Sequence, residues 1–325
     1  MDDTEYFTSD SSEDELIIAE NLLVHTHFIL TSSCATRNGG SRSKKKPNIN
    51  RVAEEGAQRL YEDYFSGASI YTDAQFRRRF RMSRKLFLKI ANDVKNSNQY
   101  FIRKPNAAGQ LGLNYLQKCT AAVRQLAYGI PADALDEYTR MAESTARKCL
   151  KEFCKTVETL YEKEFLRHPN EADIQRLLKE NEQRGFPGML GSLDCCHWEW
   201  KNCPTAWAGQ YKGKQKKPSI VLEAVASYDL WIWHAFFGMP GSNNDINVLN
   251  RSPLFSEIYS GQSPAVKFVV NARTYTSGYY LADGIYPPLA TLVQTITHPI
   301  GLKRKHFAKM QEAVQCKTSS GHSVC

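Results

Sequence analysis

The fold is decided by six short runs in the second half of the chain: MLGSLDC (189–195), SIVLEAVASYD (219–229), LWIWHAFFGM (230–239), VKFVV (266–270), GYYLADGIY (278–286) and TLVQTI (291–296). They are rich in β-branched and aromatic residues and are separated by Gly, Pro and Asn, which is typical of strands. Residues 227–229 predict a tight turn that joins the second and third runs as an antiparallel hairpin. Residues 244–261 predict a helix before the fourth run. This order predicts an α/β domain with a mixed sheet.

Three aspartates are associated with these runs. Asp194 lies in the first run, Asp283 in the fifth, and Asp245 in the loop after the third. In a mixed sheet of the ribonuclease H-like type, Asp194 and Asp283 would lie side by side at the ends of adjacent strands. Carboxylate oxygens are the ligands that Mg²⁺ prefers, and two such ions about 3.5–4 Å apart can activate water and stabilise the leaving oxygen of a phosphodiester. The pattern therefore predicts a site for Mg²⁺ or Mn²⁺ in which these three aspartates are the metal ligands and the catalytic residues.

The charge distribution indicates a polyanionic partner. The 325 residues carry a net charge of +8, yet eight of the 34 acidic side chains and none of the 42 basic ones fall in the first twenty residues. The basic excess on the rest of the chain favours a nucleic acid or an anionic membrane surface. No apolar run approaches the roughly 20 residues that cross a bilayer, so we expect DNA and no membrane.

The nine cysteines are expected to be reduced, because the acidic start lacks the pattern of a signal peptide. Most of them are expected to be small buried side chains. A zinc site made by Cys195, Cys196, His197 and Cys203 is disfavoured, because neighbours on a strand point to opposite faces. We expect His197 to support a metal ligand rather than to act as a separate base.

Composition divides the chain into four expected segments. Residues 1–54 are predicted to be a disordered tail, acidic at first and basic from Arg37 to Arg51. The basic part is typical of a nuclear import signal or a nucleic-acid arm, and a solvated linker is the alternative. Residues 55–185 are predicted to be helical, residues 186–315 to form the domain with the sheet, and residues 316–325 to be an unrelated tail.

The helical segment begins with a basic amphipathic stretch. Apolar residues from Leu86 to Val94 recur at helical spacing, and Ser83 is placed as an N-cap. Around them lie the basic residues that we expect to contact DNA: Arg77, Arg78, Arg79, Arg81, Arg84 and Lys85.

Farther along, a helix is expected to end at Gly129, a short helix follows Pro131, and a long helix begins near Glu143. Arg147 and Lys148 lie at the start of the long helix. This order is typical of a helix-turn-helix, whose second helix would enter the major groove, and a plain packing bundle remains the alternative.

The segment from 201 to 218 is a second candidate contact with DNA. It carries no acid and five lysines: Lys201, Lys212, Lys214, Lys216 and Lys217. Such a loop can hold a phosphate backbone, or it can be a solvated hairpin tip. Trp207, in the same segment, is expected either to stack on unpaired bases or to pack internally. Trp231 and Trp233 share one face of a strand and are expected to fill the core.

Three stretches carry a resemblance to a known family: GSLDCCHWEWKNCPTAWAGQY (191–211), KPSIVLEAVASYDLWIWHAFFGMPGSNNDINVLNRSPLF (217–255) and GYYLADGIYPPLATLVQTI (278–296). From 188 to about 314 the chain resembles the catalytic region of Harbinger-type transposases and the nucleases derived from them, in the plant version of the DDE endonuclease superfamily. The helical segment resembles the family's helix-turn-helix region more loosely. The resemblance implies a divalent-metal-dependent DNA endonuclease with Asp194 and Asp283 as ligands and Asp245 as a further one. It also implies a nuclear location, with the cytoplasm left open, and a Myb-like partner protein.

The family's last acid is a Glu in a D-V-E-R-A-F-G motif, thirty-six residues after Asp283, where this chain has Ser319. Glu312 is a poor substitute, because seven residues of helix rise by about 10 Å. After Val314 the chain no longer resembles the family, so the closing helix is expected to be missing and the C-terminus to be truncated. The expected function is an impaired endonuclease, and the alternative is a non-catalytic relic that binds DNA or protein.

Overall fold

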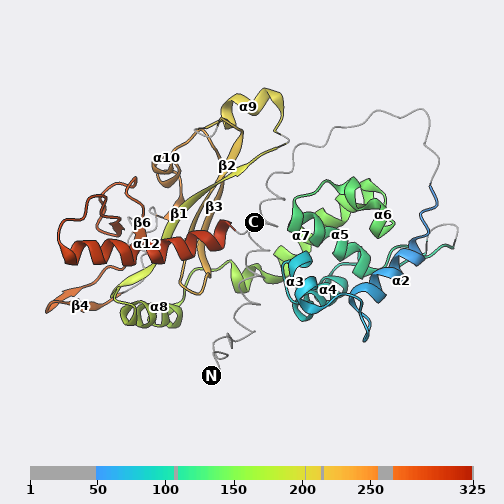
Figure 1. The fold of residues 1–325 in the computed structure, drawn as a ribbon, viewed down its shortest axis with the longest axis horizontal. Helices are drawn as coiled ribbons and strands as arrows, with labels where there is room; N and C mark the ends of the chain where they lie inside the picture. The colour runs from blue at the N-terminus through green and yellow to red at the C-terminus, as the bar shows by residue number, and fades with distance from the viewer. Residues whose placement is uncertain (1–48, 106–108, 202, 214–215, 255–265, 324–325) are drawn as a thin grey trace, which may run out of the picture. The chain divides into compact units, whose positions relative to one another are not determined.

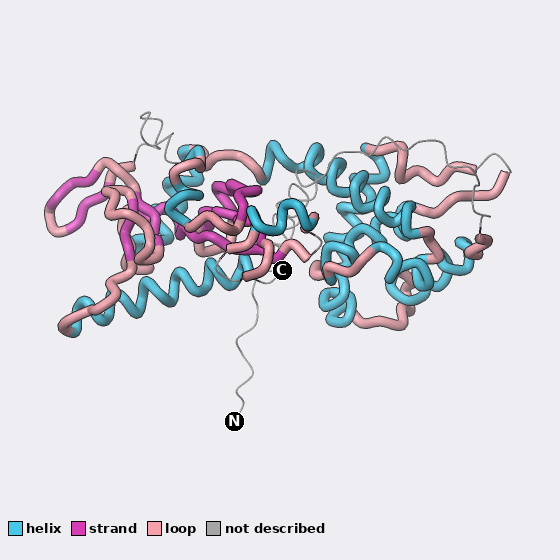
Figure 2. Tube along the Cα trace, turned by 90° about the horizontal axis from the view of Figure 1, so that it is seen from above, coloured by secondary structure: helices cyan, strands magenta, loops and turns pink. Residues whose placement is uncertain are grey.

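The computed structural model of the chain describes residues 49–105, 109–201, 203–213, 216–254 and 266–323, with side chains described as far as residue 315. The chain forms two compact units, Met1–Lys163 and Glu164–Cys325 (Figures 1 and 2). Lys214 and the part of the expected disordered tail up to residue 48 lie outside the described residues. No helix among the described residues is long and apolar enough to cross a membrane.

The described part of the first unit is helical, as the sequence predicts. Its elements are α2 (Ala53–Tyr64), α3 (Asp73–Phe80), α4 (Arg84–Ser97), α5 (Tyr115–Tyr128), the 3₁₀ helix η1 (Ala132–Leu135), α6 (Asp136–Thr139) and α7 (Glu143–Phe165). The expected N-cap is confirmed, because the Ser83 side chain accepts a hydrogen bond from the Leu86 amide at 3.2 Å. Gly129 ends α5 in the left-handed conformation with φ 59°.

The basic stretch is divided between two helices. Arg81 has φ 57° and ends α3, and α4 begins at Arg84. A capping box between Thr72 and Gln75 fixes the other end of α3, where the helix begins. The order α5, α6, α7 matches the expected succession of helices, and the assignment of a helix-turn-helix stays a prediction.

The second unit contains a five-stranded mixed sheet, which confirms the α/β class. Its strands are β1 (Met189–Glu199), β2 (Ser219–Ala226), β3 (Ile232–Pro240), β6 (Tyr279–Ala282) and β7 (Leu292–Gln294). The order is β3-β2-β1-β6-β7. β2 is antiparallel to both β1 and β3, whereas β1, β6 and β7 are parallel. The expected hairpin of the second and third runs is therefore confirmed.

The fourth apolar run does not join this sheet. β4 (Phe268–Val270) pairs with β5 (Arg273–Tyr275) as a separate two-stranded ribbon. Its two turn residues, Asn271 and Ala272, both have positive φ, as in the tight hairpin turns that follow the twist of a ribbon. The expectation that this run is a strand holds, but its placement in the main sheet was wrong because the nearby tight turn returns the chain on itself.

Four described helices complete the second unit: α8 (Glu171–Gln183), α9 (Thr205–Tyr211), α10 (Asp245–Leu249) and α12 (Leu302–Ser323). α12 lies along one face of the sheet, where Phe307 and Val314 pack with Met189 and Leu281 (Figures 1 and 2). The helix therefore continues to residue 323, and the expectation that the closing helix is missing was wrong. Side chains at Phe307, Gln311 and Val314 turn inward at helical spacing, which is what keeps the segment helical.

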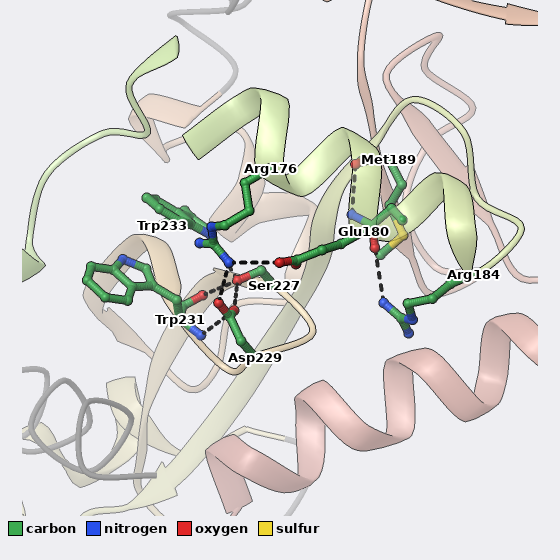
Figure 3. A network of polar contacts seen from close by, with 9 residues as sticks. Arg176, Glu180, Arg184, Met189, Ser227, Asp229, Trp231 and Trp233 are labelled. Carbon is green, nitrogen blue, oxygen red and sulfur yellow. Dashed lines mark hydrogen bonds and ion pairs between the residues drawn. The ribbon is translucent and has the colours of Figure 1, made fainter. Parts of the chain in front are cut away.

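A network of polar contacts fastens α8 to the β2–β3 hairpin (Figure 3). Arg176 donates to Asp229 at 2.8 Å, and Asp229 also accepts from Ser227. The Trp233 indole donates to Ser227 at 3.0 Å and stacks on Trp231, with 5.4 Å between ring centroids. Trp233 is 7% exposed, so its expected role in the core is confirmed. Because α8 packs on β1, it belongs with the sheet, whereas the sequence placed residues up to 185 in the helical segment.

Candidate metal site and basic surfaces

Asp194 and Asp283 are brought together by the register of two parallel strands. Ser192 of β1 pairs with Leu281 of β6, and the two aspartates follow two residues later on each side. If this register continued for two residues, Asp194 and Asp283 would lie side by side at the strand spacing of about 4.8 Å. Within β1, side chains alternate, so Asp194 shares a face with Ser192, the partner of Leu281, and Leu281 packs against Val314 of α12. The expected adjacency of β1 and β6 is confirmed, but Asp194 is the sixth of the 11 residues of β1 and does not lie at the end of its strand.

The two carboxylates differ in their surroundings. Asp194 is partly buried, and its Oδ1 accepts a hydrogen bond from the Cys195 amide at 2.8 Å. Asp283 directly follows β6 and is exposed, and its Oδ1 accepts from the Ile285 amide at 3.0 Å. These amides orient one oxygen of each carboxylate and leave the remaining lone pairs available for a cation.

Asp245 lies on the opposite face of the sheet. It is the first residue of α10, and its Oδ1 is 3.7 Å from His197 Nε2. His197 and Cys195 are two residues apart on β1, so their side chains share a face. Cys195 packs against Leu249 and Val225 on the face that carries α10. The sheet thus separates Asp245 from Asp194, although the sequence analysis grouped both at one sheet edge.

The α10 face also contains a buried carboxylate that the sequence analysis missed. Glu223 pairs with Cys195 across β1 and β2 and is 0% exposed. His234 Nε2 is 3.3 Å from Glu223 Oε1 and 3.0 Å from Ser252 Oγ. The contact with Glu223 is close enough for charge interaction but lacks hydrogen-bond alignment, so neither carboxylate oxygen has a hydrogen-bond partner. The apolar pattern of SIVLEAVA, interrupted by one acid, was the available signal.

Cys195 of β1 and Tyr286, which follows β6, are in contact on this face. The Tyr286 hydroxyl donates to Cys195 Sγ at 3.2 Å. Burial is the main cause that raises the pKa of both the Cys195 thiol and the Tyr286 phenol. Both groups are therefore neutral at physiological pH, and the contact helps to hold the residues that follow Asp194 and Asp283.

The donor set fits a divalent cation in part. Asp194 and Asp283 supply hard carboxylate oxygens from adjacent strands, which suits Mg²⁺ or Mn²⁺. Within the described residues, no group of three or more His, Cys, Asp and Glu side chains is placed to hold a metal ion together. The site with three aspartates therefore stays a prediction.

α12 runs toward the end of the sheet that carries the two acids. Gln311 donates to the carbonyl of Val293 at 3.0 Å, and one turn later Gln315 accepts from Thr295 at 3.1 Å. Thr295 is level with Asp283, because its amide donates to the carbonyl of Ala282. Position 319 follows Gln315 by one further turn, about 6 Å along the helix. Gln315 is the last residue of α12 whose side chain is described, and Glu312 is exposed.

Some of the arginines expected to contact DNA are used inside the first unit. Arg79 donates to the Tyr64 hydroxyl at 2.7 Å and stacks over the Tyr71 ring at 3.9 Å. Arg84 donates to Ser69 and to the carbonyl of Tyr71, each at 3.0 Å. These two side chains hold the segment between α2 and α3. The exposed side chains of the stretch are Arg77, Arg78, Arg81 and Lys85.

The other expected DNA contacts are also partly engaged. Arg147 forms an ion pair with Glu143 one turn earlier, and Lys148 lies over the Tyr100 ring at 5.0 Å. Lys217 is 3.0 Å from Glu199, and Lys216 is exposed. Exposed ion pairs of this kind stabilise little, so they do not prevent contact with a phosphate.

Comparisons with known proteins agree with this division of the chain. Residues 163–323 match a family model described as plant transposon protein, and residues 56–95 match a domain of unknown function. The protein ALP1-like of Arabidopsis thaliana is 27% identical over 241 residues, which cover 71% of this chain. The chain spans 57% of the length of that relative. No solved structure matches the chain. The matches relate this chain, and its second unit most directly, to transposon-derived proteins.

Proposed function

We propose that the chain is a transposase-derived endonuclease of the Harbinger type that hydrolyses phosphodiester bonds of DNA with a divalent metal. The match to plant transposon proteins supports this class. The strand order β3-β2-β1-β6-β7, with three antiparallel strands followed by two parallel ones, supports a ribonuclease H-like domain. The single observation that carries the proposal is the parallel pairing of Ser192 with Leu281, two residues before Asp194 and Asp283.

In this proposal, Asp194 and Asp283 hold Mg²⁺ or Mn²⁺ through carboxylate oxygens. When bound, such ions supply an activated water and stabilise the leaving oxygen of the phosphodiester. The protein's own contribution is positional: the amides of Cys195 and Ile285 orient the two carboxylates before the metal binds. Asp245 has a different role, because its carboxylate lies beside His197 on the other face.

Position 319 is the place where the third acid would complete the site. The family resemblance implies a Glu at this position, and α12 includes it, four residues after Gln315. This chain has Ser319, whose hydroxyl is neutral. We therefore propose that cleavage by the chain as given is weak. Ser319 also favours a second candidate function, a non-catalytic relic that binds DNA or protein.

DNA is the proposed partner, and the exposed part of the first unit supports it. Arg77, Arg78, Arg81 and Lys85 are exposed on α3 and at the start of α4. Such a surface releases condensed counterions when it contacts phosphates. A nuclear location and a Myb-like partner protein complete the proposal, on the family resemblance alone.

The test is a substitution that restores the missing carboxylate. Nicking of a labelled duplex is measured in Mn²⁺ for the chain as given, for Ser319→Glu, and for Ser319→Gln as the neutral control of similar shape. Ser319→Glu should nick the duplex about 100-fold faster than Ser319→Gln, because only the acid adds a metal ligand.

A fourth protein, Asp194→Ala combined with Ser319→Glu, should lose this gain. Equal rates for Ser319→Glu and Ser319→Gln would contradict the role of position 319. Absence of nicking in all four proteins, with duplex binding retained, would replace the endonuclease by the non-catalytic relic.

A further inference from the structure

α9 is an exposed helix with a cluster of aromatic rings at its base. None of its seven residues is buried. Trp207 of α9 is 43% exposed, and it lies in a cluster with Tyr211 of the same helix and Trp200 of the preceding segment. Large rings at the surface lose the stabilisation that burial would provide, so a cluster of them marks a surface for contact with another molecule.

The rings brace each other in a definite arrangement. Trp200 meets Tyr211 nearly at a right angle, with an interplanar angle of 83° and 5.0 Å between centroids. Trp207 lies nearly parallel to Tyr211, at 23° and 6.4 Å. Edge-to-face and offset parallel contacts of this kind are the preferred geometries of aromatic pairs. Trp207 is therefore oriented before any ligand arrives.

The segment that carries α9 is closely attached to the rest of the second unit. The Trp200 amide donates to the carbonyl of Pro218 at 2.8 Å, and Lys212 pairs with Pro218 as an isolated bridge. A side chain on Gly213 would come within 1.8 Å of the carbonyl oxygen of Gly241, in the loop before α10. Only glycine permits this close approach, which fixes the base of the segment.

The surroundings of the rings are basic. Lys201, Lys212 and Lys216 are exposed, and the only acid between residues 199 and 218 is Glu199. Glu199 is already paired with Lys217 at 3.0 Å. Trp200 follows Asp194 by six positions, about 20 Å at the usual rise of a strand, so the rings lie away from Asp194.

We propose that Trp207, supported by Tyr211 and Trp200, stacks on an unpaired base of single-stranded DNA whose phosphates are held by Lys201, Lys212 and Lys216. Every base has a π face on which an aromatic ring can stack, and lysines follow the backbone without reading sequence. In a duplex the base faces are covered by neighbouring pairs, so the proposal specifies unpaired DNA. It rests on the proposed function, since it names the form of the DNA substrate that the second unit would bind.

The test measures binding in EDTA, so that no cleavage is involved. Fluorescence anisotropy with a labelled 12-nucleotide oligo(dT) compares the full chain with Trp207→Ala, Trp207→Phe and Tyr61→Ala. Tyr61 is the matched control, because it is an exposed aromatic residue, 49% exposed, in the first unit. Trp207→Ala should weaken binding about tenfold or more, whereas Trp207→Phe should keep most of the affinity and Tyr61→Ala should change it less than about twofold.

Equal affinity of Trp207→Ala and the unaltered chain for oligo(dT) would overturn the proposal. So would an equal loss by Trp207→Ala for oligo(dT) and for a duplex of the same length. Sedimentation of the same proteins adds a third outcome: if Trp207→Ala abolishes self-association without changing DNA affinity, the ring cluster is a contact between copies and the proposal fails. Because nicking is measured separately, these binding results can be interpreted even if the chain has no nuclease activity.

Discussion

Acidic side chains have different surroundings on the two faces of the central sheet. Asp194, partly buried within β1, is on the face under α12, and Asp283, which directly follows the neighbouring strand β6, is exposed. On the face under α10, Glu223 is fully buried beside His234, and Asp245 lies beside His197. Neighbouring carboxylates near water repel each other and can bind a cation between them. A buried carboxylate beside a histidine contributes instead to the packing of the fold. The same residue type therefore predicts different roles on the two faces.

The largest effect on stability should come from the α10 face. His234→Ala leaves Glu223, which is 0% exposed, without its neighbouring imidazole. His234 also lies 3.0 Å from Ser252, so its removal leaves a buried carboxylate and a hydroxyl without their neighbour, which should cost about 3 kcal/mol of unfolding free energy. Urea unfolding followed by circular dichroism would measure the loss.

Two further variants distinguish charge from packing in that measurement. Glu223→Gln in the His234→Ala background should recover part of the lost stability, since the amide carries no charge. Asp194→Asn, on the other face, should change the free energy of unfolding in EDTA by less than about 1 kcal/mol, because it removes a repulsion near water. If Asp194→Asn destabilises as much as His234→Ala does, the contrast between the two faces is wrong.

Among the arginines of the first unit, we expect a smaller difference in stability between an engaged side chain and an exposed one. Arg79→Ala should lower the unfolding free energy by about 1–3 kcal/mol, because it removes a charged hydrogen bond to Tyr64 and a stacking contact with Tyr71. Arg78→Ala, at an exposed neighbouring position, should leave stability nearly unchanged. Thermal or urea unfolding of the two variants provides the comparison.

For binding to a DNA duplex, we expect the larger effect from Arg78→Ala and the smaller one from Arg79→Ala. At low salt, Arg78→Ala should weaken binding and reduce the slope of log affinity against log salt by about one, as expected for one lost phosphate contact. Folded Arg79→Ala should retain the slope of the unaltered chain. An unchanged slope for Arg78→Ala would remove α3 from the proposed DNA surface.

Much of the candidate site follows from local sequence patterns. The apolar runs that end near Asp194 and Asp283 predict strands, and the turn at 227–229 predicts the β2–β3 hairpin, because alternation and turn residues act over short distances. The adjacency of the two acids follows from placing both runs as neighbours in one mixed sheet.

Other features depend on packing that no local pattern contains. Asp245 is only five residues beyond β3, yet its face is decided by how α10 packs on Val221 and Val225 of β2 rather than by its own motif. The sequence at Phe268 predicts a strand, but it does not show that the strand pairs with β5 rather than with the main sheet. Arg79 looks like a surface cation in a basic run, and only the positions of Tyr64 and Tyr71 show that it is engaged.

Binding of Mn²⁺, measured by calorimetry, shows which face of the sheet holds the metal and needs no cleavage. The full chain is titrated beside Asp194→Asn and Asp245→Asn, two substitutions of the same kind on opposite faces of the sheet. If Asp194 and Asp283 form the metal site, Asp194→Asn should lower the affinity about tenfold or more, and Asp245→Asn should stay within about twofold of the unaltered chain. An equal loss in both variants, or a loss in Asp245→Asn alone, would contradict the account.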